Sequence, residues 1–110
     1  MKSAVAYDFV GPGHFDLEFR IDLSFFPGEE PTFAFRTDDG HVPDPAPGLQ
    51  CIGNTIIDGE DFFLLKVLSP PAEGHVSFQF PADGEYRVEI YLIRENAKPK
   101  LIFAECFVCK

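Results

Sequence analysis

The chain of 110 residues has the length of one ordinary domain and, with 45% hydrophobic residues, can bury a core without metals or disulfides. Its formal net charge is −9. Nucleic-acid binding depends on Lys and Arg that neutralise phosphates, so this charge argues against a nucleic-acid partner and an anionic membrane surface. Three cysteines make a poor disulfide framework, and no apolar run reaches the roughly 18 residues of a membrane-spanning helix. We therefore expect one cytoplasmic domain over residues 1–110, without a signal peptide.

Alternating apolar and polar residues predict strands along most of the chain. A first strand is expected at 3–9, with Val5, Tyr7 and Phe9 directed inward. The clearest alternation runs over 15–25, and Pro27-Gly28 ends it because proline cannot donate to a strand ladder. Its inward residues are expected to be Phe15, Leu17, Phe19, Ile21, Leu23 and Phe25. Phe26 is directed outward by the alternation, or else caps the core at the strand end beside Pro27.

Five further strands are expected after this one, and no segment shows a helical period with caps. Their ranges are 32–37, 62–68, 75–80, 85–93 and 101–109. A short strand around Leu49–Ile52 would bring the total to eight. The rest of 38–61 is expected to form one long irregular loop that begins with polyproline character.

Seven or eight short strands with regular turn signals predict an all-β, antiparallel β-sandwich. Residues 83–88 (DGEYRV) resemble the tyrosine corner of immunoglobulin-like domains, in which a Tyr opens the sixth strand and bonds back to the main chain. The resemblance implies an immunoglobulin-like sandwich in which Tyr86 takes that role and Val88 fills the position that a cysteine holds in antibody domains. The chain departs from the antibody pattern in lacking a Trp, for which Phe33 or Phe35 would stand in. Such sandwiches serve many functions, so the fold alone indicates none.

Apolar residues on the last two expected strands occupy positions where alternation predicts exposure. Tyr91 and Ile93 fall on the outer face of 85–93, and both faces of 101–109 are apolar. If these strands are neighbours in one sheet, Tyr91, Ile93, Phe103 and Phe107 form one outer apolar patch of the kind that marks interfaces. The alternative is that the 38–61 loop covers the last strand. The patch predicts a non-enzymatic module that forms a homodimer or binds a protein partner.

The 38–61 loop supports a second hypothesis, a small-molecule or metal site. Asp38, Asp39, His41 and Asp44 would supply its polar ligands. Calcium takes six to eight oxygens, which loops between strands can provide. The D-x-D-x-D-G spacing of a calcium loop is absent, however, and turns use the same residues.

Other residues that could carry chemistry do not assemble into a motif. Cys106 and Cys109 have the C-x-x-C spacing, but side chains three apart on a strand point to opposite faces, and no second pair completes a zinc site. No serine has the G-x-S-x-G context of a nucleophile elbow. We therefore expect no catalytic residue, no metal and no cofactor.

Overall fold

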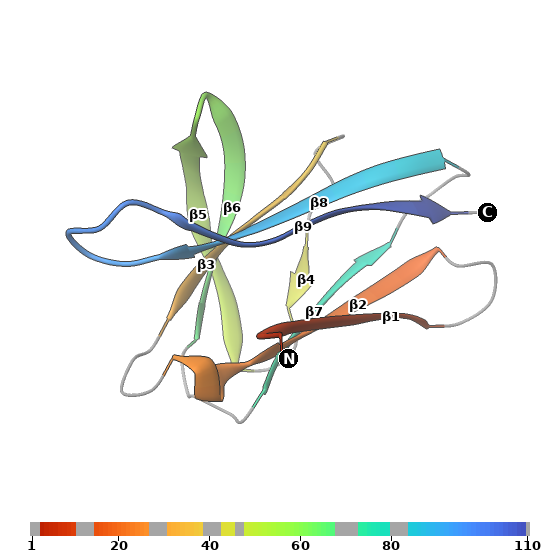
Figure 1. Cartoon of the computed structure of the whole chain (residues 1–110), viewed down its shortest axis with the longest axis horizontal. Helices are drawn as coiled ribbons and strands as arrows, with labels where there is room; N and C mark the ends of the chain where they lie inside the picture. The colour runs from red at the N-terminus through yellow and green to blue at the C-terminus, as the bar shows by residue number, and fades with distance from the viewer. Residues whose placement is uncertain are drawn as a thin grey trace.

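The computed structural model is a sandwich of two antiparallel β-sheets (Figure 1). The structure describes residues 3–10, 15–26, 31–38, 43–45, 48–67, 73–79 and 84–109. Within them lie nine strands: β1 Val5–Val10, β2 Asp16–Asp22, β3 Thr32–Thr37, β4 Asp44–Pro45, β5 Leu49–Ile57, β6 Glu60–Val67, β7 Glu73–Gln79, β8 Gly84–Ile93 and β9 Lys100–Cys109. A four-stranded sheet has the order β1-β2-β7-β4, and a five-stranded sheet has the order β5-β6-β3-β8-β9. The predicted all-β antiparallel sandwich is confirmed.

The second strand is shorter than its alternation predicts. β2 ends at Asp22, whose carboxylate accepts hydrogen bonds from the backbone N–H and the hydroxyl of Ser24. This local contact winds Leu23–Phe25 into a 3₁₀ turn, named η2, which competes with continued pairing. The expected inward direction of Phe25 is consequently wrong, since Phe25 is exposed. Phe26 is buried in the core, which agrees with the alternative that it caps the core and not with an outward direction.

The expected long loop at 38–61 is also wrong, because most of it is a β-hairpin. β5 and β6 pair along their length, and the turn between them consists of Asp58 and Gly59. Both turn residues have positive φ, at 51° and 81°. Asp-Gly with positive φ at both positions is the preferred two-residue hairpin turn, because its twist matches that of the strands. The Asp-Gly pair was thus a signal for this hairpin in the sequence.

The main hydrophobic core lies between the two sheets and follows the predicted alternation. β2 contributes Leu17, Phe19 and Ile21, and β8 contributes its four alternate residues from Tyr86 to Leu92. The remaining buried members are Val5, Leu23, Phe26, Phe33, Phe35, Leu49, Leu65, Val67, Val76, Phe78, Phe107 and Cys109. The expected inward direction of Val5 is confirmed. The Tyr7 ring also packs on core rings, those of Phe19 and Phe107, but on the edge strand β1 it keeps 39% of its surface exposed.

The five-stranded sheet is strongly twisted and carries a second, smaller core on its outer face. Figure 1 shows β5 and β6 running at a steep angle to β8 and β9 within this one sheet. Ala34, at the centre of β3, is fully buried, and Phe62 and Ile57 of the same cluster are 2% and 9% exposed. β6 is therefore covered on both faces, because Leu65 lies in the main core and Phe62 in this outer cluster.

Candidate interaction surface

Phe103 and Phe107 face the main core and not the outside of the molecule. The pairing of β8 with β9 places Phe107 opposite Tyr86 and Phe103 opposite Ile90, both of which point inward. Phe107 is only 5% exposed, and its ring centroid lies 4.8 Å from that of Tyr7 on β1. Phe103 is partly buried, with its centroid 5.7 Å from the same tyrosine. These two phenylalanines join the sheets at the side where β1 and β9 approach each other.

Tyr91 and Ile93 lie on the opposite, outer face of the five-stranded sheet. Both pack on the outer cluster, where the Tyr91 ring meets the edge of Phe62 at 5.2 Å between centroids. Tyr91 stands directly opposite Ala34, whose small side chain leaves room for this contact. The expected single patch of four residues is therefore wrong. Tyr91 and Ile93 of β8 lie on the outer face, whereas the register of β9 with β8 directs Phe103 and Phe107 toward the main core.

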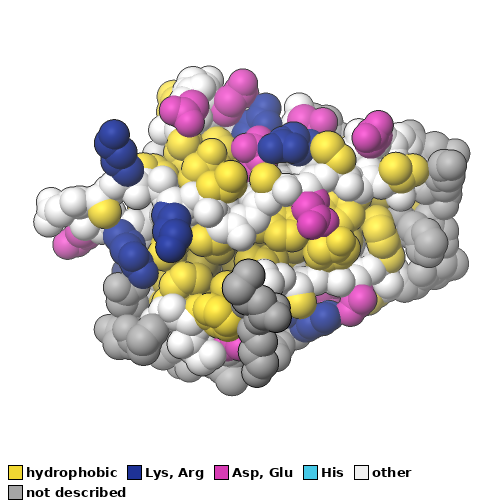
Figure 2. Space-filling model, viewed as in Figure 1, with side chains coloured by type: hydrophobic (Ala, Val, Ile, Leu, Met, Phe, Trp, Pro, Cys, Tyr) yellow, Lys and Arg dark blue, Asp and Glu magenta, His cyan; other side chains and the backbone are white. Residues whose placement is uncertain are grey.

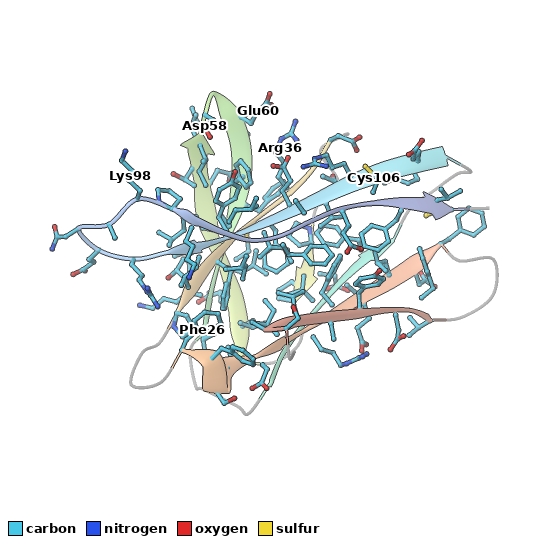
Figure 3. The ribbon with its side chains drawn as sticks, in the orientation of Figure 1. Phe26, Arg36, Asp58, Glu60, Lys98 and Cys106 are labelled. Atoms are coloured by element: carbon cyan, nitrogen blue, oxygen red, sulfur yellow. The ribbon has the colours of Figure 1, made fainter. Side chains whose placement is uncertain are left out.

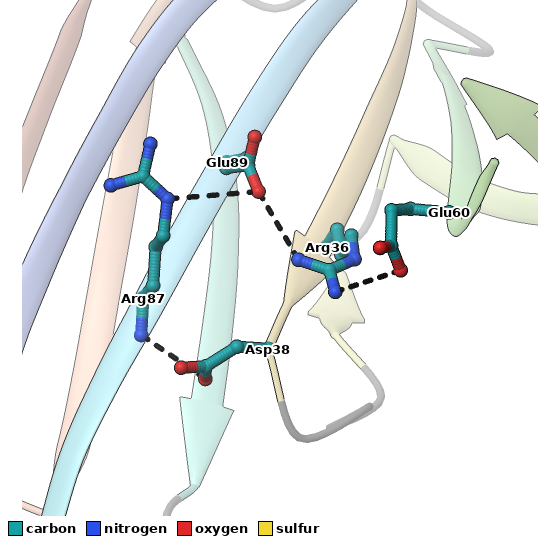
Figure 4. A network of polar contacts seen from close by, with 5 residues as sticks. All are labelled: Arg36, Asp38, Glu60, Arg87 and Glu89. Atoms are coloured by element: carbon teal, nitrogen blue, oxygen red, sulfur yellow. Dashed lines mark hydrogen bonds and ion pairs between the residues drawn. The ribbon is translucent and has the colours of Figure 1, made fainter. Parts of the chain in front are cut away.

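An ion-pair network crosses the outer face beside this cluster (Figure 4). Arg36 on β3 reaches Glu60 on β6 at 3.0 Å and Glu89 on β8 at 3.1 Å. Glu89 also lies 3.7 Å from the Nε of Arg87, and the backbone N–H of Arg87 donates to the Asp38 carboxylate at 3.2 Å. The Arg36 and Glu89 side chains are each only 18% exposed, so solvent screens their pairing less than that of a fully exposed pair. The network ties three adjacent strands together.

Glu105 interrupts the inward row of phenylalanines on β9. It stands opposite Val88, between Phe103 and Phe107, and is exposed at the open side of the sandwich. A hydrogen bond that the Tyr7 hydroxyl donates to the Glu105 carboxylate raises the pKa of Tyr7 above its ordinary value, and partial burial and the negative charge of Glu105 act in the same direction. Figure 2 shows hydrophobic side chains gathered along this side, between β1 and β9.

Exposed apolar side chains concentrate on the edges of the sheets. β1 is an edge of the four-stranded sheet, and β5 and β9 are the two edges of the five-stranded sheet. Among the described residues, six of the seven large hydrophobic side chains that are exposed lie on these three strands. They are Tyr7 and Val10 on β1, Ile52 and Ile56 on β5, and Leu101 and Val108 on β9, while Phe25 is the seventh. Edge strands also present unpaired backbone N–H and C=O groups, so each edge offers both parts of a strand-pairing surface.

Two of the four residues predicted to form a ligand site, Asp38 and Asp44, lie within the described part of the chain. Asp38 continues the pairing of β3 with β8, since its N–H donates to the Arg87 carbonyl and its carboxylate accepts from the Arg87 N–H. Asp44 is exposed on β4 of the four-stranded sheet, where it pairs with Ser77 of β7. Asp39 and His41 lie outside the described residues. Within the described part of the chain, no group of three or more His, Cys, Asp or Glu side chains has the arrangement of a metal site.

The three cysteines are free thiols in separate settings. Cys106 is exposed on the outer face of β9 (Figure 3), whereas Cys109 is buried in the main core. The prediction that their side chains diverge is confirmed, because an odd spacing on a strand alternates faces. Cys51 is exposed on β5.

Comparison of this chain with protein-family models, with curated proteins and with solved structures finds no match. The immunoglobulin-like resemblance of residues 83–88 thus stays a prediction, although Tyr86 and Val88 are both buried on the inner face of β8. In the part of the chain that is described, no helix combines the length and apolar character required to cross a membrane.

Proposed function

We propose that this domain is a non-enzymatic interaction module of immunoglobulin-like type that associates through the edges of its β-sheets, with a second copy or with another protein. The observation that carries the proposal concerns the described residues: six of their seven exposed large hydrophobic side chains lie on the edge strands β1, β5 and β9. Soluble sheet proteins usually protect their edges with charges, proline or short strands, because an open apolar edge pairs with other chains.

The outer face of the five-stranded sheet contributes less to such a contact than the sequence indicates. Tyr91 and Ile93 are already half-buried against the outer cluster, and Arg36 and Glu89 satisfy each other beside them. A side chain that has lost most of its exposed surface has little hydrophobic free energy left to gain from a partner. The edges retain that surface, since Ile56 on β5 is 68% exposed.

The test places a lysine on each of the edge strands β1, β5 and β9 in turn, because a charge on an edge strand opposes the addition of another strand. The edge variants are Val10→Lys, Ile56→Lys and Leu101→Lys. The matched control is Phe25→Lys, which removes a comparably exposed hydrophobic side chain from the 3₁₀ turn. Native mass spectrometry and sedimentation measure assembly, and thermal melts verify that each variant folds.

We expect an assembly that the wild type and Phe25→Lys form and that at least one edge variant loses at an unchanged melting temperature. A different protein partner is sought by a pull-down in which the wild type and the variants are the bait proteins. The wild type and Phe25→Lys would retain such a partner, and an edge variant would lose it. If neither self-assembly nor an edge-dependent partner is found, or if the monomer carries a bound small molecule instead, the proposal is wrong.

A further inference from the structure

The four edge strands of the two sheets differ in how well they are protected against pairing. β1 carries Asp8, which pairs with Arg20 at 2.9 Å, and β9 carries Lys100 and Glu105. β4 has only two residues, one of which is Pro45 and has no N–H to donate. Charge, proline and shortness are the devices by which sheet proteins prevent edge-to-edge contact.

β5 is the unprotected edge. Its nine residues, LQCIGNTII, include no charged residue and no proline, in a chain of which 25% is charged. Two of its side chains, Ile52 and Ile56, are exposed by 50% and 68%. We propose that two copies of this chain pair through β5, antiparallel and centred on Thr55, which joins their five-stranded sheets into one. The inference rests on the proposed function and names the partner and the edge.

The hairpin turn determines which backbone groups of β5 are free. Residues that flank a two-residue turn exchange hydrogen bonds, so the pair of Ile57 and Glu60 bonds within the hairpin, and alternate residues of β5 do the same. Asn54 and Ile56 consequently direct their N–H and C=O groups away from β6. In a pairing centred on Thr55, Asn54 of each copy meets Ile56 of the other, which satisfies all of these groups at once.

The neighbouring registers are poorer. The pairing of β5 with β6 shifts between Cys51 and Gly53, which makes Ile52 the extra residue of a β-bulge. Gly53 has a φ of 144°, a conformation that side chains rarely adopt. A pairing centred on residue 54 would place Ile56 against this bulge, and one centred on residue 56 would place Asn54 against the Asp58 turn. The regular segment Gly53–Ile57 therefore favours Thr55 as the centre.

Charge favours a second copy in the antiparallel orientation. Each copy carries a net charge of −9, and its hairpin tip presents the exposed residues Asp58, Glu60 and Asp61 (Figure 3 labels the first two). An uncharged edge is where two such chains can approach without like charges meeting. In antiparallel pairing the two Asp58 residues are six positions apart, about 20 Å at a rise of about 3.4 Å per residue, beyond the Debye length of about 8 Å. Parallel pairing would place the two acidic tips side by side.

The opposite end of β5 suits the acidic tip. Lys66 on β6 pairs with Gln50, so it lies at the end of the hairpin that would receive the tip of the other copy. Lys66 is the one basic residue of the β5–β6 hairpin, and it is partly exposed. The antiparallel pair thus brings opposite charges toward each other at both ends, which is the complementarity expected of a two-fold contact.

A disulfide across the two-fold axis tests this register directly. Thr55 of one copy would face Thr55 of the other as a non-hydrogen-bonded pair, with Cβ atoms about 4.5–5.5 Å apart, close to disulfide distance. In a Cys51→Ser, Cys106→Ser background, Thr55→Cys should form a covalent dimer on mild oxidation, read on a non-reducing gel. The matched control is Gln50→Cys, on the same strand and at least as accessible as Thr55, because Gln50 is exposed and Thr55 partly exposed. The two Gln50→Cys positions would lie about 30 Å apart and should not cross-link.

Sedimentation of the lysine variants provides the second readout. Ile56→Lys should raise the dissociation constant of the dimer by at least about tenfold, because the symmetry introduces the charge twice, while Leu101→Lys on the other edge leaves it unchanged. A dimer that survives Ile56→Lys but is lost with Leu101→Lys would overturn this inference and leave the proposed function standing. A wild-type monomer that loses a different protein partner on Ile56→Lys would also overturn self-pairing. A monomer with no edge-dependent partner would refute both.

Discussion

Replacing Phe107 by alanine distinguishes a core residue from an interface residue on β9. Phe107 is 5% exposed and its ring lies among four aromatic rings. The distances between centroids are 4.8 Å to Tyr7, 5.9 Å to Phe19, 6.0 Å to Phe9 and 6.2 Å to Phe103. Truncation of this side chain therefore removes packing between the two sheets. The variant should then be destabilised whether or not the protein associates.

The expected loss follows from the burial of the ring. Phe→Ala in a core costs about 3–5 kcal/mol, from lost transfer free energy and the cavity that remains. Phe107 lies on an edge strand at the open side of the sandwich, where solvent can enter the cavity, so we expect the lower end, about 3 kcal/mol. For a domain of this size that corresponds to a fall in melting temperature of about 12 °C.

Urea unfolding followed by circular dichroism measures this loss. Val108→Thr is the matched control, because Val108 is the next residue of the strand and is 52% exposed. The control keeps a β-branched side chain and should change the free energy of unfolding by less than about 0.5 kcal/mol. If Phe107→Ala remained within about 1 kcal/mol of the wild type while an assembly dissociated, Phe107 would be an interface residue and the inward register of β9 would be refuted.

Three further predictions test the outer face, the open side and the hairpin turn. Arg36→Met should lower the free energy of unfolding by about 1–2 kcal/mol by removing two charge-assisted hydrogen bonds, and a double-mutant cycle with Glu89→Gln should recover part of that loss as coupling. Tyr7→Phe should destabilise the domain at neutral pH. Because the pKa of Tyr7 is raised in the folded state, its contribution is complete below about pH 10 and disappears as the pH rises through that higher pKa, so urea titrations of wild type and variant should converge at alkaline pH. Gly59→Ala should cost roughly 1–2 kcal/mol in thermal or urea unfolding, because an L-residue would have to adopt a φ of 81°, and an unchanged stability would contradict the turn geometry.

Local chemistry explains where sequence reasoning and the structure differ. The alternation around Phe19 continued through Phe25, and period alone predicted one strand, but the Asp22 side chain bonded Ser24 and ended it. The Asp58-Gly59 pair is a hairpin signal that outweighs the irregular composition before it. In both cases short-range hydrogen bonding and turn geometry decided the element, and hydrophobic period did not.

The ligand hypothesis shows a different limit. Asp38 was singled out as an acidic loop residue, yet its carboxylate and its N–H both bond to Arg87 on the neighbouring strand. Nothing in the sequence near Asp38 indicates this partner, because the two residues are 49 positions apart. Contacts at such separation depend on strand order, which composition and spacing do not specify.

The sequence by itself determined the all-β class, the position of most strands and the inward faces of β2, β3 and β8, because a period of two with one solvated face allows a single orientation. Only the tertiary structure decided the orientation of β9. Both of its faces are apolar, so alternation left the direction open until pairing with β8 placed Phe107 opposite Tyr86. The outer core also depended on tertiary structure, since β3 with its small Ala34 had to lie between β6 and β8 before the rings of Phe62 and Tyr91 could meet. Which strands became edges was likewise determined by the order of the strands in space.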